Sequence, residues 1–135
     1  MNRTLSILTS GQGLNEITDQ VRTVVAESQV REGLCTVFIR HTSASLIIQE
    51  NADPSARRDL EAWLNRLVPE EDSLYTHNDE GPDDMPAHLK AALTAVSISI
   101  PVVEAELVLG RWQGIYVWEH RRAPHRRQVV VHVGA

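Results

Sequence analysis

The stretch VSISIPVVEAELVLGRWQGIYVWEHRRAPHRRQVVVHV, residues 96–133, decides the fold class. It contains four strand-like runs of alternating apolar and polar residues: VSISIPV, AELVL, GIYVWEH and RQVVVHV. No helical pattern separates these runs, whereas parallel strands need a long crossover connection, usually a helix. The order therefore excludes an alternating α/β chain and predicts largely antiparallel pairing.

The first two-thirds of the chain add three more strands and two or three helices. Apolar spacing predicts a helix over residues 14–28, despite its β-branched residues. Asp53 followed by Pro54 predicts a helix start, and this helix is expected to end before Pro69. Pro86 is expected to start a short helix. The remaining predicted strands are residues 3–10, 34–40 and 45–49.

Together these elements predict an α+β fold, predominantly antiparallel β. The expected architecture is a sandwich or jelly-roll-like barrel with two or three flanking helices. A length of 135 residues fits one domain over residues 1–135, and 42% hydrophobic with 23% charged residues is typical of a globular protein. Leu60, Trp63, Leu64 and Leu67 are the predicted buried stripe of the second helix.

The sequence composition also limits which binding partners and which cellular location are expected. Apolar runs are too short to span a bilayer, and the first residues lack the apolar segment of a secretory signal, so the cytoplasm is expected. The net charge of −5 and the absence of a lysine cluster argue against nucleic-acid binding. Cys35 is the only cysteine, and we expect it to be a buried core residue.

Three of the six histidines occupy positions where metal ligands often occur. His41 follows a predicted strand, His77 lies in a long acidic loop, and His88 falls in a first helical turn. Neutral imidazole is a common ligand of zinc and related metals, and three histidines with an open position make a catalytic arrangement. Their spacing matches no short zinc motif, and each histidine taken singly also fits a structural or solvated role.

Acidic residues surround two of these histidines in the segment from Pro69 to Pro86. Asp79, Asp83 and Asp84 can act as partners that orient a ligating histidine, as ligands of a hard cation, or as part of a solvated loop. If a metal is bound, Asp84 is the candidate to fix the tautomer of a histidine.

The run GRWQGIYVWEH, residues 110–120, places Gln113 and Glu119 on one face of a single strand. If that face lines the histidine cleft, Gln113 can donate a hydrogen bond to substrate and Glu119 can act as a general base. The alternative is that this strand belongs to the core, with Trp112 and Trp118 as core aromatics.

Four arginines flank Ala123-Pro124-His125. Guanidinium groups bind phosphate or carboxylate through paired hydrogen bonds, so Arg121 and Arg127 are candidates to hold a phosphate. The alternative is a solvated hairpin tip, which is the expectation for at least two of the four arginines.

Four blocks of the sequence resemble the YjbQ family, whose members are described as secondary thiamine-phosphate synthase enzymes. They are HTSASL (41–46), QENADPSARRDLEAWLNRLVPE (49–70), YTHNDEGPDDMPAHLKAAL (75–93) and WQGIYVWEHR (112–121). The similarity extends from about residue 34 to residue 134. The chain departs from the family pattern at Ala105, where a glycine is usual, at Arg111, where a threonine is usual, and in its Gly134-Ala135 ending.

The resemblance implies a β-rich sandwich, a homotrimer and a metal site lined by the histidines of the HTSA and PAH motifs. It implies thiamine phosphate synthase chemistry, in which a pyrimidine diphosphate joins a thiazole phosphate and pyrophosphate leaves. The expected metal ligands are His41, His77 and His88, and the expected catalytic residues are Ser43, Asn51, Gln113 and Glu119.

Two functions follow as hypotheses. The first is an enzyme that uses a divalent metal ion, with zinc as one candidate, to act on a phosphorylated small molecule. The second is a non-catalytic trimeric module that binds a metabolite or a protein and holds a structural ion. An open coordination position favours the first, and a closed site with four protein ligands favours the second. A Ser43 or Cys35 nucleophile lacks a supporting motif.

Overall fold

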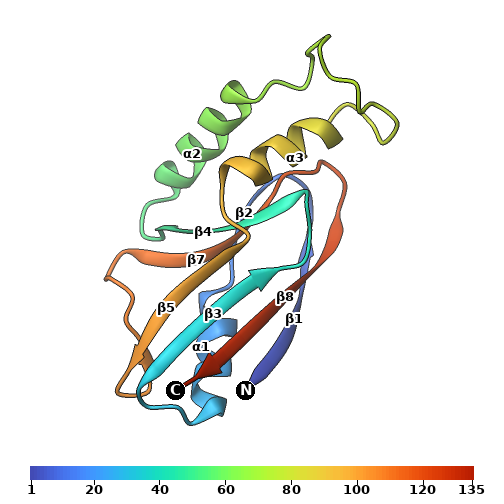
Figure 1. Cartoon of the computed structure of the whole chain (residues 1–135). Helices are drawn as coiled ribbons and strands as arrows, with labels where there is room; N and C mark the ends of the chain where they lie inside the picture. Colours follow the sequence, from blue (N-terminus) through green and yellow to red (C-terminus); the bar gives the residue numbers. More distant parts are fainter.

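The computed structural model describes residues 1–135 and contains eight strands and three helices (Figure 1). The strands are β1 (Asn2–Thr9), β2 (Gly13–Glu16), β3 (Gly33–Ile39), β4 (Ala44–Glu50), β5 (Ser97–Val103), β6 (Glu106–Leu107), β7 (Gln113–Glu119) and β8 (His125–Gly134). The helices are α1 (Thr18–Ser28), α2 (Pro54–Leu67) and α3 (Asp84–Leu93).

The strands form a five-stranded sheet of order β1-β8-β3-β5-β6 and a three-stranded sheet of order β2-β7-β4. Every paired strand is antiparallel. The predicted α+β class with mostly antiparallel strands and flanking helices is therefore confirmed. No helix of the structure has the length and apolar character needed to cross a membrane.

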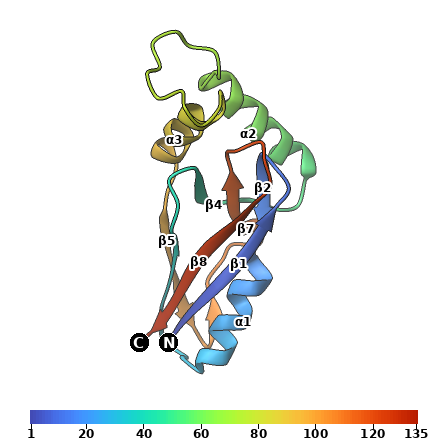
Figure 2. The same cartoon turned by 90° about the vertical axis from the view of Figure 1, so that its right-hand side faces the viewer.

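The main core lies between the two sheets and α1. Seventeen buried residues form it, including Val21 of α1, Val37 of β3 and Val117 of β7. Cys35 is fully buried in this cluster as expected, and burial raises the pKa of its thiol to about 11. No helix covers the outer face of the five-stranded sheet, because α1 packs on the inner side (Figure 2).

The first helix begins later than its apolar spacing predicts. Residues 13–16 form β2 and pair with β7, and α1 starts only at Thr18. The side chain of Leu14 lies in a second apolar cluster with Tyr116 and Trp118 rather than on α1. Tertiary pairing with a buried strand has overridden the local helical pattern here.

The second helix begins where the sequence predicts. Asp53 precedes Pro54, and the Asp53 carboxylate accepts a hydrogen bond of 2.9 Å from the Ser55 amide. Its predicted apolar stripe is only partly buried, because Trp63 and Leu67 are 50% and 52% exposed. Helices α2 and α3 lie together over the three-stranded sheet, where Leu64 of α2 packs in the second apolar cluster with Tyr116 and Trp118 (Figure 1).

A tight turn joins β5 to the short strand β6. Glu104 and Ala105 both adopt positive φ angles, of 52° and 68°. Glycine adopts this left-handed backbone without the steric penalty of a Cβ atom. The position where the resembled family has glycine is thus one that favours glycine in this fold, and Ala105 occupies it under strain.

Candidate functional site

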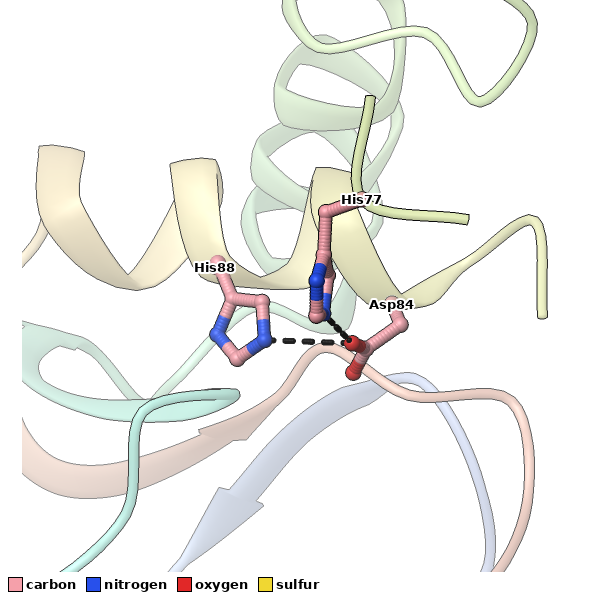
Figure 3. A group of neighbouring side chains, drawn as sticks. All are labelled: His77, Asp84 and His88. Carbon is pink, nitrogen blue, oxygen red and sulfur yellow. Dashed lines mark hydrogen bonds and ion pairs between the residues drawn. The ribbon is translucent and has the colours of Figure 1, made fainter. Parts of the chain in front are cut away.

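A cluster of two histidines and one aspartate lies at the start of α3 (Figure 3). The loop after α2 supplies His77, and the first turns of α3 supply Asp84 and His88, one helical turn apart. One ligand atom from each of the three residues lies within 4.8 Å of the other two. The Nε2 atoms of His77 and His88 lie 2.7 and 3.2 Å from the same oxygen, Asp84 Oδ2.

A backbone contact fixes the tautomer of His88. Its Nδ1 lies 2.8 Å from the carbonyl oxygen of Thr42, which can only accept a hydrogen bond. The Nδ1 atom therefore carries the proton, and in the neutral ring Nε2 presents a lone pair toward Asp84 Oδ2. A lone pair facing a carboxylate oxygen needs a cation or a proton between the two atoms.

The other carboxylate oxygen of Asp84 is held by Arg121. The Arg121 guanidinium donates at 2.7 Å to Asp84 Oδ1 and at 3.0 Å to Asp83. Burial alone would raise the pKa of Asp84, but the hydrogen bond from His77 and the charge of Arg121 lower it below its usual value. Asp84 is thus an anion with one oxygen directed at the two imidazoles.

These three side chains fit a divalent metal ion by their chemistry. Two imidazole nitrogens and one carboxylate oxygen are ordinary ligands of zinc and of other transition metals. The side chains of His77 and His88 are 48% and 30% exposed, which leaves one side of the group accessible to solvent. The Thr42 carbonyl and Arg121 would orient His88 and Asp84 from behind.

The structure corrects the expected position of His41. Its Nε2 accepts a hydrogen bond of 2.8 Å from the Gln128 amide, and its Nδ1 lies 3.4 Å from Arg127. Burial and the neighbouring Arg127 charge lower the pKa of His41. His41 lies outside the group of converging ligand atoms, and its chain neighbour Thr42 contacts that group through a carbonyl instead.

The structure also corrects the expected roles of Glu119 and Arg127. Glu119 is fully buried, and its carboxylate is ion-paired with Arg127 and accepts hydrogen bonds from Thr9 and the Arg121 amide. Ser43 is drawn into the same network, because its hydroxyl accepts from Arg127 at 3.0 Å. A saturated carboxylate without solvent access is poorly placed to act as a general base.

Neither candidate phosphate-binding arginine is free for a ligand. Arg127 is enclosed with Glu119, and its guanidinium also contacts Ser43. Arg121 donates to Asp83, to Asp84 and to the carbonyl of Glu80. Its geometry gives it the role of holding Asp84 in place.

Gln113 and Asn51 lie together but away from the histidines. Gln113 is the first residue of β7 and Glu119 the last, so six residues, roughly 20 Å of extended strand, separate them. The Gln113 side chain accepts from the Gly110 amide at 2.7 Å, and Asn51 contacts Glu16 and the Gln113 carbonyl. These residues stabilise the far ends of β4 and β7.

Sequence comparison assigns this chain to a known protein family. The family model described as UPF0047 protein YjbQ-like matches residues 3–135. The chain belongs to the YjbQ/UPF0047 family. It is 54% identical over 129 residues to a UPF0047 protein of Synechocystis, which covers 96% of this chain and 88% of that protein. It is 36% identical to the YjbQ protein of Escherichia coli O157:H7, over 95% of this chain and 93% of that protein.

Solved structures of the YjbQ/UPF0047 family share the fold. A conserved family protein from Clostridium acetobutylicum superposes with a TM-score of 0.91 at 36% identity, covering 98% of this chain and 99% of that chain. A conserved hypothetical protein from Thermus thermophilus superposes with a TM-score of 0.88 at 31% identity, covering 98% and 99%. The family resemblance inferred from the four sequence blocks is thereby confirmed.

Proposed function

We propose that this YjbQ-family chain is an enzyme that binds a divalent metal ion through His77, Asp84 and His88. The convergence of both Nε2 atoms on one Asp84 oxygen carries the proposal, because the Thr42 carbonyl keeps the lone pair of His88 on that side. Three protein ligands with exposed imidazoles leave room for a further ligand, as in catalytic sites. The alternative of a closed structural ion would need a fourth protein ligand.

The proposed substrate is a phosphorylated small molecule, and the specific reaction proposed is thiamine phosphate synthase-like transfer with release of pyrophosphate. A bound metal would supply positive charge that stabilises the leaving phosphate groups. His77, His88 and Asp84 would hold it, and Arg121 keeps Asp84 anionic and oriented. The family resemblance suggests this reaction, and the ligand geometry supports its metal requirement.

Metal binding is the first test of this proposal. In untagged protein stripped with a chelator and reloaded, we expect one zinc or similar ion per chain. His77→Ala and His88→Ala should weaken metal affinity by more than about 100-fold, since loss of even an outer partner typically costs 10- to 100-fold. Titration calorimetry and elemental analysis measure this, with His132→Ala as the matched control at an exposed histidine of β8.

Pyrophosphate release from the pyrimidine diphosphate and thiazole phosphate is then compared among the same proteins. Activity that follows metal occupancy supports the proposed enzyme. Unchanged metal affinity in both histidine variants contradicts the metal site. Intact metal binding without metal-dependent turnover contradicts the proposed reaction and favours the binding module.

We also propose that the chain forms a homotrimer, as the family resemblance implies. The uncovered outer face of the five-stranded sheet carries Leu34 and Phe38, which are 46% and 44% exposed. Light scattering should give three times the chain mass of 15.1 kDa. Phe38→Lys should lower that mass, whereas Leu74→Lys, at an 83% exposed loop residue, should not. A stable monomer at micromolar concentration contradicts the trimer.

A further inference from the structure

Lys90 is the only lysine among the 13 lysine and arginine residues of the chain. It lies on α3 two positions after His88, and this spacing turns it toward the opposite side of the helix from His88. Its side chain points toward α2, where Nζ donates a hydrogen bond of 2.6 Å to Asn65 Oδ1. Lys90 is only 3% exposed, which is rare for a lysine without a charged partner.

The buried ammonium has no counter-ion within contact distance. None of the ion pairs of the structure includes Lys90. An ammonium has three donors, and the hydrogen bond to Asn65 uses only one of them. Burying a charge without compensation is costly, so an uncompensated ammonium beside a cavity indicates a missing acceptor.

The cavity beside Lys90 consists of two neighbouring hollows, each lined mainly by polar side chains. The inner part has a volume of about 150 Å³ and is lined by Gln12, Glu61, Asn65 and His120 as well as Lys90. An outer hollow of about 420 Å³ shares Gln12, Asn65 and Lys90 with it. Lys90 and Asn65 therefore line both hollows.

Two of the four carboxylates around this cavity, those of Glu70 and Glu119, are ion-paired with arginines. Glu119 is paired with Arg127, and Glu70 in the outer hollow is paired with Arg122. Glu61 accepts a hydrogen bond of 3.0 Å from the Leu14 amide and lies beyond contact distance from the ammonium. Lys90 is the only lysine or arginine on the inner part, and Glu61 and Glu71 line the two spaces without an ion pair.

Asn65 supplies a second donor at the same point. Because the ammonium can only donate, the Asn65 oxygen faces Lys90, and the nitrogen of the same amide group remains as a donor. The Asn65 amide nitrogen makes no hydrogen bond within the chain. The other side-chain amide on this cavity belongs to Gln12, and it donates to the His120 carbonyl. Ammonium and amide donors side by side are chemistry that binds an oxyanion.

We propose that this cavity is a binding site for a small oxyanion, a carboxylate or phosphate group, held by Lys90 Nζ and Asn65 Nδ2. It is separate from the proposed metal site, because the two use opposite sides of α3. Its occupant offsets the buried charge of Lys90, so binding also raises the thermal stability of the fold.

The test uses the full chain after chelator treatment, so that bound metal plays no part. Inorganic phosphate and acetate are titrated against chloride at constant ionic strength, and affinity is followed by calorimetry and by the unfolding midpoint. We expect a saturable rise of the midpoint with at least one of the two anions. The anion that binds identifies the group as phosphate or carboxylate.

Two variants remove the site in different ways. Lys90→Met keeps the length of the side chain without its charge, and Asn65→Asp supplies a counter-ion from within the chain. Both should weaken anion binding at least about tenfold, the usual effect of losing a charge-assisted hydrogen bond. Arg66→Gln, at the exposed neighbour of Asn65, is the matched control and should bind as the wild type does.

Asn65→Asp should also unfold at a higher temperature than the wild type when no anion is added. If Lys90→Met does not fold, Asn65→Asp alone decides the outcome. No saturable binding of either anion overturns the proposal, and so does undiminished binding in Asn65→Asp.

Discussion

The Glu119→Gln variant is expected to have a free energy of unfolding about 3–5 kcal/mol below that of the wild type, because it leaves the buried Arg127 guanidinium without a counter-charge. Glu119 is fully buried and Arg127 is 3% exposed, so water cannot replace the lost charge. The substitution also changes the acceptor of the Thr9 hydroxyl and of the Arg121 amide. Urea unfolding followed by circular dichroism measures the difference.

A double variant separates the lost ion pair from a general packing defect. Adding Arg127→Met to Glu119→Gln removes the unpaired charge, so part of the lost stability should return. Thr9→Val serves as a control that removes the hydrogen bonds of one hydroxyl, to Glu119 and to the His125 backbone, and no charge. Its expected cost is about 1 kcal/mol per hydrogen bond. Wild-type stability in Glu119→Gln together with a large loss of turnover would contradict this structural role and restore Glu119 as a general base.

The pattern of strands could be predicted from the sequence because each strand carries its own alternation and turn residues. The strand at residues 13–16 could not, because Leu14 and Ile17 also fit the apolar face of a helix that continues through Val21. Its pairing with β7 decides the conformation, and such long-range pairing leaves no local signal. The exposure of Trp63 likewise depends on which side of α2 faces the second apolar cluster, where Leu64 is buried and Trp63 is absent.

The candidate site was predictable in part, because some of its residues carry a local sequence signal. His77 and His88 stand out as histidines in a loop and in a first helical turn, and the structure brings them together. Asp84 was expected to orient a histidine, to bind a hard cation or to belong to a solvated loop, and Pro86 was expected to start the helix two residues later than α3 begins. With the observed start at Asp84, the i, i+4 spacing to His88 places both on one face of the helix.

His41 and Gln113 show the limit of reasoning from motifs. Histidine after a strand is equally suited to accept a backbone hydrogen bond, and the Gln128 amide supplies one. The period of two puts Gln113 and Glu119 on one side of β7, but β7 is the central strand of its sheet and this side faces the main core. Gln113 and Glu119 therefore lie on the same side of β7 without lining a common cleft.

Lowering the pH from 6.5 to 4.5 is expected to reduce the free energy of unfolding by roughly 1 kcal/mol per pH unit through His120 alone. Burial, and next the charge of Lys90, lower the pKa of His120 from 6.5 to about 3. The ring is 1% exposed, and its Nε2 lies 2.9 Å from the Ser45 hydroxyl. Below pH 6.5 the unfolded chain binds a proton at this position and the folded chain does not, so acid favours unfolding until the pH approaches 3.

The charges that face His120 come from three elements: Lys90 of α3, Glu119 of β7 and Arg127 of β8. Glu119 has a lowered pKa of its own, because the hydrogen bonds from Arg127 and Thr9 outweigh the effect of burial, and its contribution is lost only below its ordinary value of 4.5. The interval between pH 6.5 and 4.5 therefore isolates the histidines. His41, whose pKa is also lowered, adds a change of the same sign.

The His120→Gln variant tests this assignment, since its amide can still bond to Ser45 but does not titrate. Urea unfolding at several pH values should show a shallower dependence on pH for His120→Gln than for the wild type, whatever the variant costs at neutral pH. The control His132→Gln, at an exposed histidine, should keep the wild-type slope. Equal slopes for the wild type and His120→Gln would mean that His120 binds its proton as readily in the folded chain as in the unfolded one, and that its burial is relieved by solvent in the cavity beside Lys90.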